Sequence, residues 1–162
     1  MTGLSLALNR PTNGPTEPMS RLLIPLVRLD QKRRPDEILG PWSKLVEDSQ
    51  EPCVVLDPSG AVVAASGAAA ELLGEFGPDQ LVGHHLLDVV NLVDFHGGPA
   101  GAVYVDRLAP LLALAGNTLA RGLLRVRSPD DSTRTLDAVA APLHNAAGEV
   151  VGTIAFLAAI WS

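Results

Sequence analysis

The chain has 162 residues, of which 47% are hydrophobic and 19% are charged, and its formal net charge is −6. This length fits one domain of ordinary size with some additional chain, and the apolar fraction excludes a wholly disordered protein. Because aromatic residues make up only 4%, leucine, valine and alanine must fill the core. Alanine is small, so we expect either closely approaching elements or a cavity.

Cysteine content and hydropathy indicate where the protein works. Cys53 is the single cysteine, which excludes an intramolecular disulfide bond and leaves the cytoplasm as the expected compartment. No apolar run reaches the roughly eighteen residues that a membrane span needs, and the N-terminal LSLALN lacks the cationic start of a signal peptide. We therefore expect no membrane association.

Basic residues concentrate in the first 35 residues. This segment carries six basic against two acidic side chains, whereas the remainder carries six against sixteen. It holds five prolines and no sustained apolar period, so residues 1–35 are predicted to form a disordered basic arm. The cluster QKRRP has two interpretations: contact with nucleic acid or an acidic partner, or solvated linker charge, which is the commoner role of charged tails.

A short amphipathic helix is predicted within residues 36–50, flanking the domain. Its apolar positions are separated by three and four residues: Ile38, Leu39, Trp42, Leu45 and Val46. Proline suits the first turn of a helix, and it disfavours helical geometry in the residue before it. We therefore expect the helix to begin near Pro41 and to end before Pro52.

The domain itself is assigned to residues 51–162 and opens with a hairpin in VVLDPSGAVVAAS, residues 54–66. Three consecutive apolar residues in its first arm, Val54, Val55 and Leu56, indicate a strand that is covered on both faces or lies at the sheet centre. The following Pro-Ser-Gly suits a reversal, because proline presets one backbone torsion and glycine adopts a positive φ at little steric cost.

Helical segments follow the hairpin. A helix after Ser66 is predicted to end at Gly74 or Gly77, and PDQLVG adds a helical turn with Pro78 at its first position. Residues 84–100 read as a helical turn that runs into a loop. In DRLAPLLALAGN the spacing i, i+3, i+4, i+7 predicts a longer helix with a single buried stripe. The stripe consists of Leu108, Leu111, Leu112 and Ala115.

Three strands complete the chain, at residues 120–128, 132–144 and 149–160. Their connectors, PDD and NAAG, are short and rich in turn formers, which favours antiparallel pairing over a parallel crossover. Two strands, several helices and three strands in this order predict an α+β domain, with helices packed on one face of a five-stranded antiparallel sheet.

The ordered set of these segments resembles a PAS domain over residues 49–160. The resemblance rests on the D-x-x-G turn of the first hairpin, on the LVG that closes the helical segment, and on the closing hairpin PLHNAAGEVVG. Ser66 stands where the family often has asparagine. PAS domains are sensory and interaction modules, and most lack enzymatic activity, so the resemblance implies a non-enzymatic module in signal transduction or transcriptional regulation.

The resemblance also implies where a ligand and a partner would bind. A small ligand would lie between the long helix and the sheet, among residues that we expect to line the pocket: Leu108, Leu111, Leu112, Leu124 and Val126. A homodimer would form through the helix that precedes the domain, with Trp42, Leu45 and Val46 at the interface. A regulatory protein partner remains open beside the homodimer.

No cofactor or metal is expected, although one cofactor alternative stays open. A flavin-adduct photosensor needs a reactive cysteine in the helical segment, whereas Cys53 heads a strand among apolar residues. Haem ligation by His84, His85 or His96 is chemically feasible, but the residues around them favour ordinary polar and loop positions. The same histidines lack the spacing of a metal site.

Arginines gather on the predicted hairpin at 120–144. Strand alternation places Arg125 and Arg127 on one face, opposite Leu124 and Val126. That face either binds an anionic ligand or acidic partner, or is an ordinary solvated surface near Asp137.

Three hypotheses for the whole protein follow from the sequence. It is a small-ligand sensor, a pure interaction and dimerisation module with a side-chain-filled core, or a regulator that binds nucleic acid through the basic arm.

Overall fold

The computed structural model describes residues 35–74, 77–96, 98–105 and 107–160. The basic arm predicted for residues 1–35 lies outside the described residues, apart from Pro35. The described chain from Pro35 onward belongs to one compact unit. No helix among the described residues is both long enough and apolar enough to cross a membrane.

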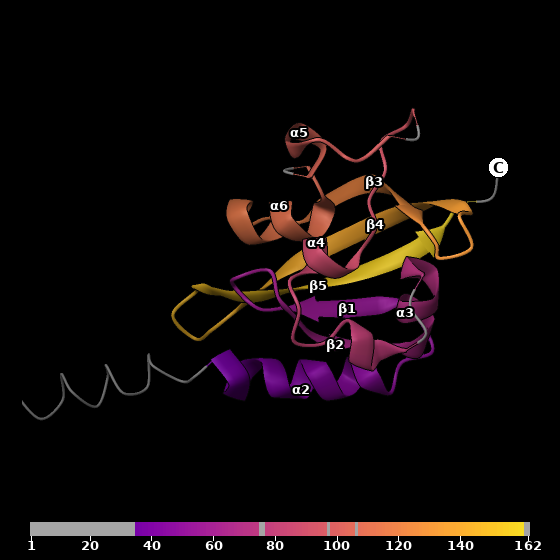
Figure 1. The fold of residues 1–162 in the computed structure, drawn as a ribbon. Helices are drawn as coiled ribbons and strands as arrows, with labels where there is room; N and C mark the ends of the chain where they lie inside the picture. Colours follow the sequence, from indigo (N-terminus) through magenta and orange to yellow (C-terminus); the bar gives the residue numbers. More distant parts are fainter. Residues whose placement is uncertain (1–34, 75–76, 97, 106, 161–162) are drawn as a thin grey trace, which may run out of the picture. The chain divides into compact units, whose positions relative to one another are not determined.

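A five-stranded sheet organises this unit (Figure 1). Its strands are β1 (Cys53–Leu56), β2 (Val62–Ala65), β3 (Ala120–Arg127), β4 (Thr133–His144) and β5 (Val150–Ala159). They lie in the order β2-β1-β5-β4-β3, and every neighbouring pair is antiparallel. The predicted fold class and all five predicted strands are confirmed.

The side chain of Asp57 stabilises the turn of the first hairpin. Its Oδ1 accepts hydrogen bonds from the Ser59 amide at 2.8 Å, the Ser59 hydroxyl at 2.6 Å and the Ala61 amide at 3.1 Å. Gly60 has a φ of 86°, which a residue with a Cβ adopts only at a steric cost. The sequence Asp-Pro-Ser-Gly therefore specifies the turn by a local mechanism.

The helical segment contains α3 (Gly67–Leu73), the 3₁₀ turn η1 (Pro78–Gln80), α4 (Leu86–Val89), α5 (Ala102–Val105) and α6 (Ala109–Gly116). Ser66 caps α3, because its hydroxyl oxygen accepts from the Ala69 amide at 3.1 Å. The same oxygen accepts from the Cys53 amide at 3.1 Å, and its proton goes to the Glu51 carbonyl at 2.8 Å. Gly74, in the left-handed conformation, ends the helix as predicted.

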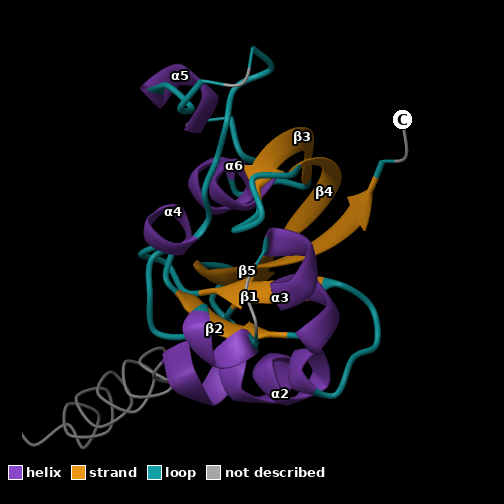
Figure 2. Cartoon of the chain, turned by 45° about the vertical axis from the view of Figure 1, so that its right-hand side comes forward, coloured by secondary structure: helices purple, strands orange, loops and turns teal. Residues whose placement is uncertain are grey.

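The inner face of the sheet carries the main core. Val54 and Leu56 of β1, Leu136, Ala138 and Ala140 of β4, and Ala155 and Leu157 of β5 are buried against the helical segment. Helix α6 packs across β3, β4 and β5 (Figure 2). Its buried positions are Ala109, Pro110 and Ala113, whereas Leu111 and Leu114 are half-buried and Leu112 and Ala115 are exposed.

The predicted buried stripe is confirmed at Leu108, holds in part at Leu111, which packs half-buried against the inner core, and is wrong at Leu112 and Ala115. Leu108 is 4% exposed and precedes the first turn. The segment is apolar on all sides, so spacing alone could not decide which side faces the sheet. The small residues face it, because they allow the helix axis to lie close to a sheet surface that is itself rich in alanine.

The outer face carries a second cluster under α2 (Pro35–Glu47). Leu39 and Val46 of α2 pack with Cys53 and Val55 of β1 and Ile154 of β5, which alternate with the residues of the inner core. Figures 1 and 2 show α2 on the side of the sheet opposite α4 and α6. Among the described residues, α2 thus covers the second face of the sheet, whereas α3, α4 and α6 pack on the first.

Helix α2 begins earlier than predicted. It starts at Pro35 rather than near Pro41, and Pro41 lies inside it at an exposed position. A proline within a helix removes one backbone hydrogen bond and costs stability. Here the packing of Leu39 and Val46 in the outer cluster holds the turns on either side of it.

Both edges of the sheet are covered by the segment that precedes α5. At the β2 edge, the amide of Val62 donates to the His84 carbonyl at 2.9 Å and that of Gly83 to the Val62 carbonyl at 2.8 Å. At the β3 edge, the amide of Val93 donates to the Arg125 carbonyl at 3.0 Å. The chain between these contacts, which includes α4, crosses from one edge to the other, and pairing at both ends blocks addition of a further strand there.

Strand β1 and helix α2 both approach β5 closely at Gly152. A Cβ added there would stand 2.5 Å from the Leu56 carbonyl oxygen and 2.8 Å from a methyl carbon of Leu39. We predict that Gly152→Ala destabilises the protein by about 1–3 kcal/mol, since β1 and α2 must both shift. Chemical denaturation of the two proteins measures this difference.

Gly67→Ala is the matched control. No atom lies within 4 Å of the Cβ position at Gly67, which opens α3. Its stability should stay within about 0.5 kcal/mol of the wild type. Equal effects of the two substitutions would show that the approach at Gly152 is not tight.

Candidate functional site

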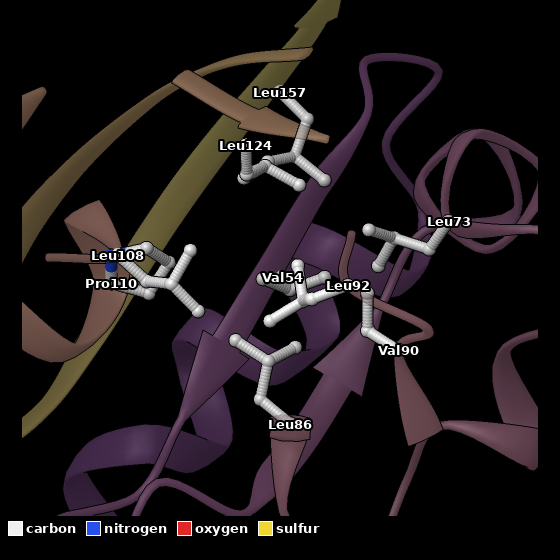
Figure 3. A pocket seen from close by; sticks show the side chains of 9 residues that line it. All are labelled: Val54, Leu73, Leu86, Val90, Leu92, Leu108, Pro110, Leu124 and Leu157. Atoms are coloured by element: carbon white, nitrogen blue, oxygen red, sulfur yellow. The ribbon is translucent and has the colours of Figure 1, made fainter. Parts of the chain in front are cut away.

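The candidate site is an apolar cavity between the inner face of the sheet and the helical segment (Figure 3). Helices and loops supply Leu73, Leu86, Val90, Leu92, Leu108 and Pro110; strands β1, β3 and β5 supply Val54, Leu124 and Leu157. All nine are aliphatic or proline residues. The wall therefore offers dispersion contacts and no charged or hydrogen-bonding side chain.

The free space among these side chains is small. It measures about 20 Å³, scarcely more than the ~10–15 Å³ that admits one water molecule. Apolar cavities that bind benzene are near 150 Å³ on the same scale. As the side chains stand, the cavity is a packing void rather than a ligand chamber.

The five predicted pocket residues divide into four groups. Leu108 and Leu124 line the cavity. Val126 is fully buried in the inner core but is not one of the nine lining residues. Leu112 is 38% exposed on α6, and Leu111 lines a separate cleft.

That second cleft is open and lies at the end of the sheet where β5 begins. Pro58, Ser59 and Gly60 of the first hairpin form one side, and Leu111, Leu114 and Ala115 of α6 together with Val150 form the other. Its volume is about 290 Å³. Sequence reasoning missed this cleft, because its walls come from segments that are far apart in the chain and that no spacing pattern connects.

The three candidate haem histidines do not converge. His85 is half-buried and caps α4, where its Nδ1 accepts from the Leu87 amide at 3.2 Å. His84 and His96 are exposed, and none of the three lines the cavity. Among the described residues, no group of three or more His, Cys, Asp or Glu side chains is arranged to hold a metal ion.

The arginines of β3 and β4 mostly tie neighbouring segments to the sheet. Arg125 donates to the Phe95 carbonyl at 3.1 Å and Arg134 to the Glu71 carbonyl at 3.0 Å. Arg121 makes a two-point contact with Asp137, at 3.0 and 2.6 Å, and its hydrogen bonds hold the pKa of that carboxyl below its ordinary value. These contacts favour the ordinary-surface interpretation over an anion site.

The residues predicted for a dimer interface have different environments. Trp42 is 38% exposed and Leu45 is 61% exposed, although both belong to α2. Val46 is 1% exposed because it packs in the outer cluster. It therefore anchors α2 to its own sheet, whereas Trp42 and Leu45 lie on the exposed side of the helix.

Family comparison agrees with this architecture. The family profile described as the PAS fold matches residues 46–160. The chain belongs to the PAS family. PAS domains are sensory and signalling modules, generally without catalysis, and the inner-face cavity of this PAS domain lies within the matched residues. No match is found among curated proteins.

Solved structures share the fold at low sequence identity. A light-oxygen-voltage domain studied with a flavin analogue gives a TM-score of 0.57 at 21% identity, covering 74% of this chain and 84% of that chain. The PAS domain of a protein from Colwellia psychrerythraea gives 0.54 at 16%, covering 76% and 97%. VqmA bound to DPO gives 0.56 at 17%, covering 74% and 56%.

A flavin or a haem does not fit the cavity of this PAS domain. The nine lining side chains offer no polar partner to a flavin ring and no histidine to a haem iron. The free volume of about 20 Å³ is far below the size of either group. Cys53, the thiol considered for a flavin adduct, is buried in the outer cluster, on the face of β1 opposite the cavity.

Truncating a cavity wall tests how tightly the core is packed. Leu124 is 5% exposed and lines the cavity, so Leu124→Ala should destabilise the domain by about 2–5 kcal/mol. It should also create room for a small apolar molecule, detected as an increase in melting temperature with benzene. Leu119→Ala, at a position that is 67% exposed, is the control and should do neither. A wild-type domain that responds to benzene as strongly as the variant would contradict the packed core.

Proposed function

We propose that this PAS domain is a non-enzymatic signalling module that works by protein–protein contact, with its core filled by its own side chains. The observation that supports this proposal is the small size of the inner cavity, about 20 Å³, which nine apolar residues line. A module without an internal ligand must signal through its surface. The expected setting is cytoplasmic signal transduction or transcriptional regulation.

A homodimer is the contact that the exposed side chains of α2 support. Tryptophan is enriched among residues that dominate binding energy, because it buries a large area at a small cost in conformational entropy. Trp42 and Leu45 are exposed although Leu39 and Val46 of the same helix are buried. The helix is thus held firmly on one side and presents apolar surface on another.

A small-ligand sensor is the second candidate. The cavity has the place that the resemblance assigned to a ligand, between the sheet and the helical segment, and VqmA, a structural neighbour, is bound to DPO. Its aliphatic wall restricts such a ligand to a small, uncharged, apolar molecule that displaces α4 or α6 on entry. Native mass spectrometry of freshly purified protein separates the two candidates, since it reports bound molecules and subunit number together.

Substitution of Trp42 tests the dimer. Trp42→Ala should raise the dimer dissociation constant about tenfold or more, as measured by sedimentation at matched concentrations. Leu112→Ala, at an equally exposed leucine on α6, should leave self-association unchanged. Unaltered sedimentation of the Trp42 variant, or a monomeric wild type, would refute this interface.

A further inference from the structure

His85 stands at the junction between α4 and the first hairpin. The Ala61 and His85 backbones form an antiparallel bridge, and the Leu86 amide donates to the Gly60 carbonyl at 3.0 Å. The imidazole ring packs on Gly60 so closely that a Cβ there would lie 2.5 Å from Nε2. The ring is thus confined beside the turn.

The other nitrogen of this ring caps α4. Nδ1 lies 3.2 Å from the Leu87 amide and accepts its proton, which requires Nδ1 to be unprotonated. In neutral imidazole the proton then resides on Nε2. A second proton would turn Nδ1 into a donor facing another donor, and the cap would be lost. Rotation of the ring offers no substitute, since it places carbon at the amide.

Helix α4 is also a wall of the cavity. Leu86 follows the capping histidine directly, and Val90 follows the last residue of the helix; both line the cavity. Helix α4 has only four residues and therefore few backbone hydrogen bonds of its own. The cap consequently contributes a large part of the stability of this helix. Loss of the cap therefore acts on the cavity wall.

We propose that His85 is a proton-operated latch: with Nδ1 unprotonated it caps α4 through the Leu87 amide, and with Nδ1 protonated that cap is lost and the α4 wall of the inner cavity loosens. Histidine is the side chain type that changes charge between about pH 5 and 8, and this interval sets the pH range of the test. The proposal concerns the cavity wall and does not depend on the homodimer.

The surrounding charges do not replace the lost cap. The titratable side chains on the elements around His85 are His84, Asp88, Asp57 and Glu149. His84 and Asp88 are exposed. The Oδ1 of Asp57 is engaged within its own turn, and Glu149 accepts from Asn145 at 2.8 Å. Helix α6, across the open cleft, carries no titratable side chain.

Amide hydrogen exchange on the full chain tests the latch. Protection factors, corrected for intrinsic exchange, should fall about fivefold or more at the Leu87 and Val90 amides between pH 7.5 and pH 5.5. The amides of Val54 and Ala155 in the sheet should keep their protection. No selective fall at α4 would overturn the proposal.

His85→Asn is the decisive variant, because asparagine is among the best capping residues and does not titrate in this range. In this variant α4 should stay protected at both pH values. His84→Asn, which replaces the exposed neighbour, should keep the wild-type fall. A fall in the His85 variant equal to that of the wild type would refute the latch.

The tautomer of His85 supplies a test that needs no substitution. Nitrogen NMR of the imidazole at pH 7.5 should show the proton on Nε2. A proton on Nδ1 at that pH would overturn the proposal, since the cap requires a free lone pair there.

Discussion

The close approach of α6 to an alanine-rich sheet surface determines how this domain uses its interior. Ala109 and Ala113 of the helix meet a sheet that presents Ala138, Ala140 and Ala155, all of them 0% or 1% exposed. Small residues on both sides bring the two layers together, and the leucines and valines around them fill the remaining space to about 20 Å³. Composition left open a cavity or a close approach, and the structure shows the close approach.

Local chemistry made most of the fold predictable. The turn at Asp57–Gly60, the cap at Ser66 and the stop at Gly74 each rest on a side chain or torsion that acts within a few residues, and short connectors specify antiparallel hairpins. Two predictions were wrong: which side of α6 faces the sheet, and where α2 begins. Helix α6 is apolar on every side, so its spacing carried no directional information, and the start of α2 was misplaced because tertiary packing overrides the usual preference of proline for a first turn.

The candidate site was predictable only in part, since its walls come from segments without periodicity. Leu108 and Leu124 were found because regular elements carry them. Leu86, Val90 and Leu92 were missed, because their position depends on hydrogen bonds that tie the segment to both edges of the sheet. The capping position of His85 was missed for the same reason. Its ring packs on Gly60, which is distant in the sequence, and no spacing pattern connects the two residues.

Strand β5 contributes side chains to both faces of the sheet, the inner core and the outer cluster under α2. Ala155 and Leu157 face the inner core, whereas Ile154 packs under α2 and Phe156, 48% exposed, faces outward. Because successive side chains of one strand point to opposite faces, a shift of the inner wall moves the backbone that carries the outer contacts. Gly152 tightens this link, since the Leu56 carbonyl of β1 and a methyl group of Leu39 of α2 lie against the position where a Cβ would stand. The inner cavity and α2, which carries Trp42, therefore lie on opposite sides of a single layer of backbone.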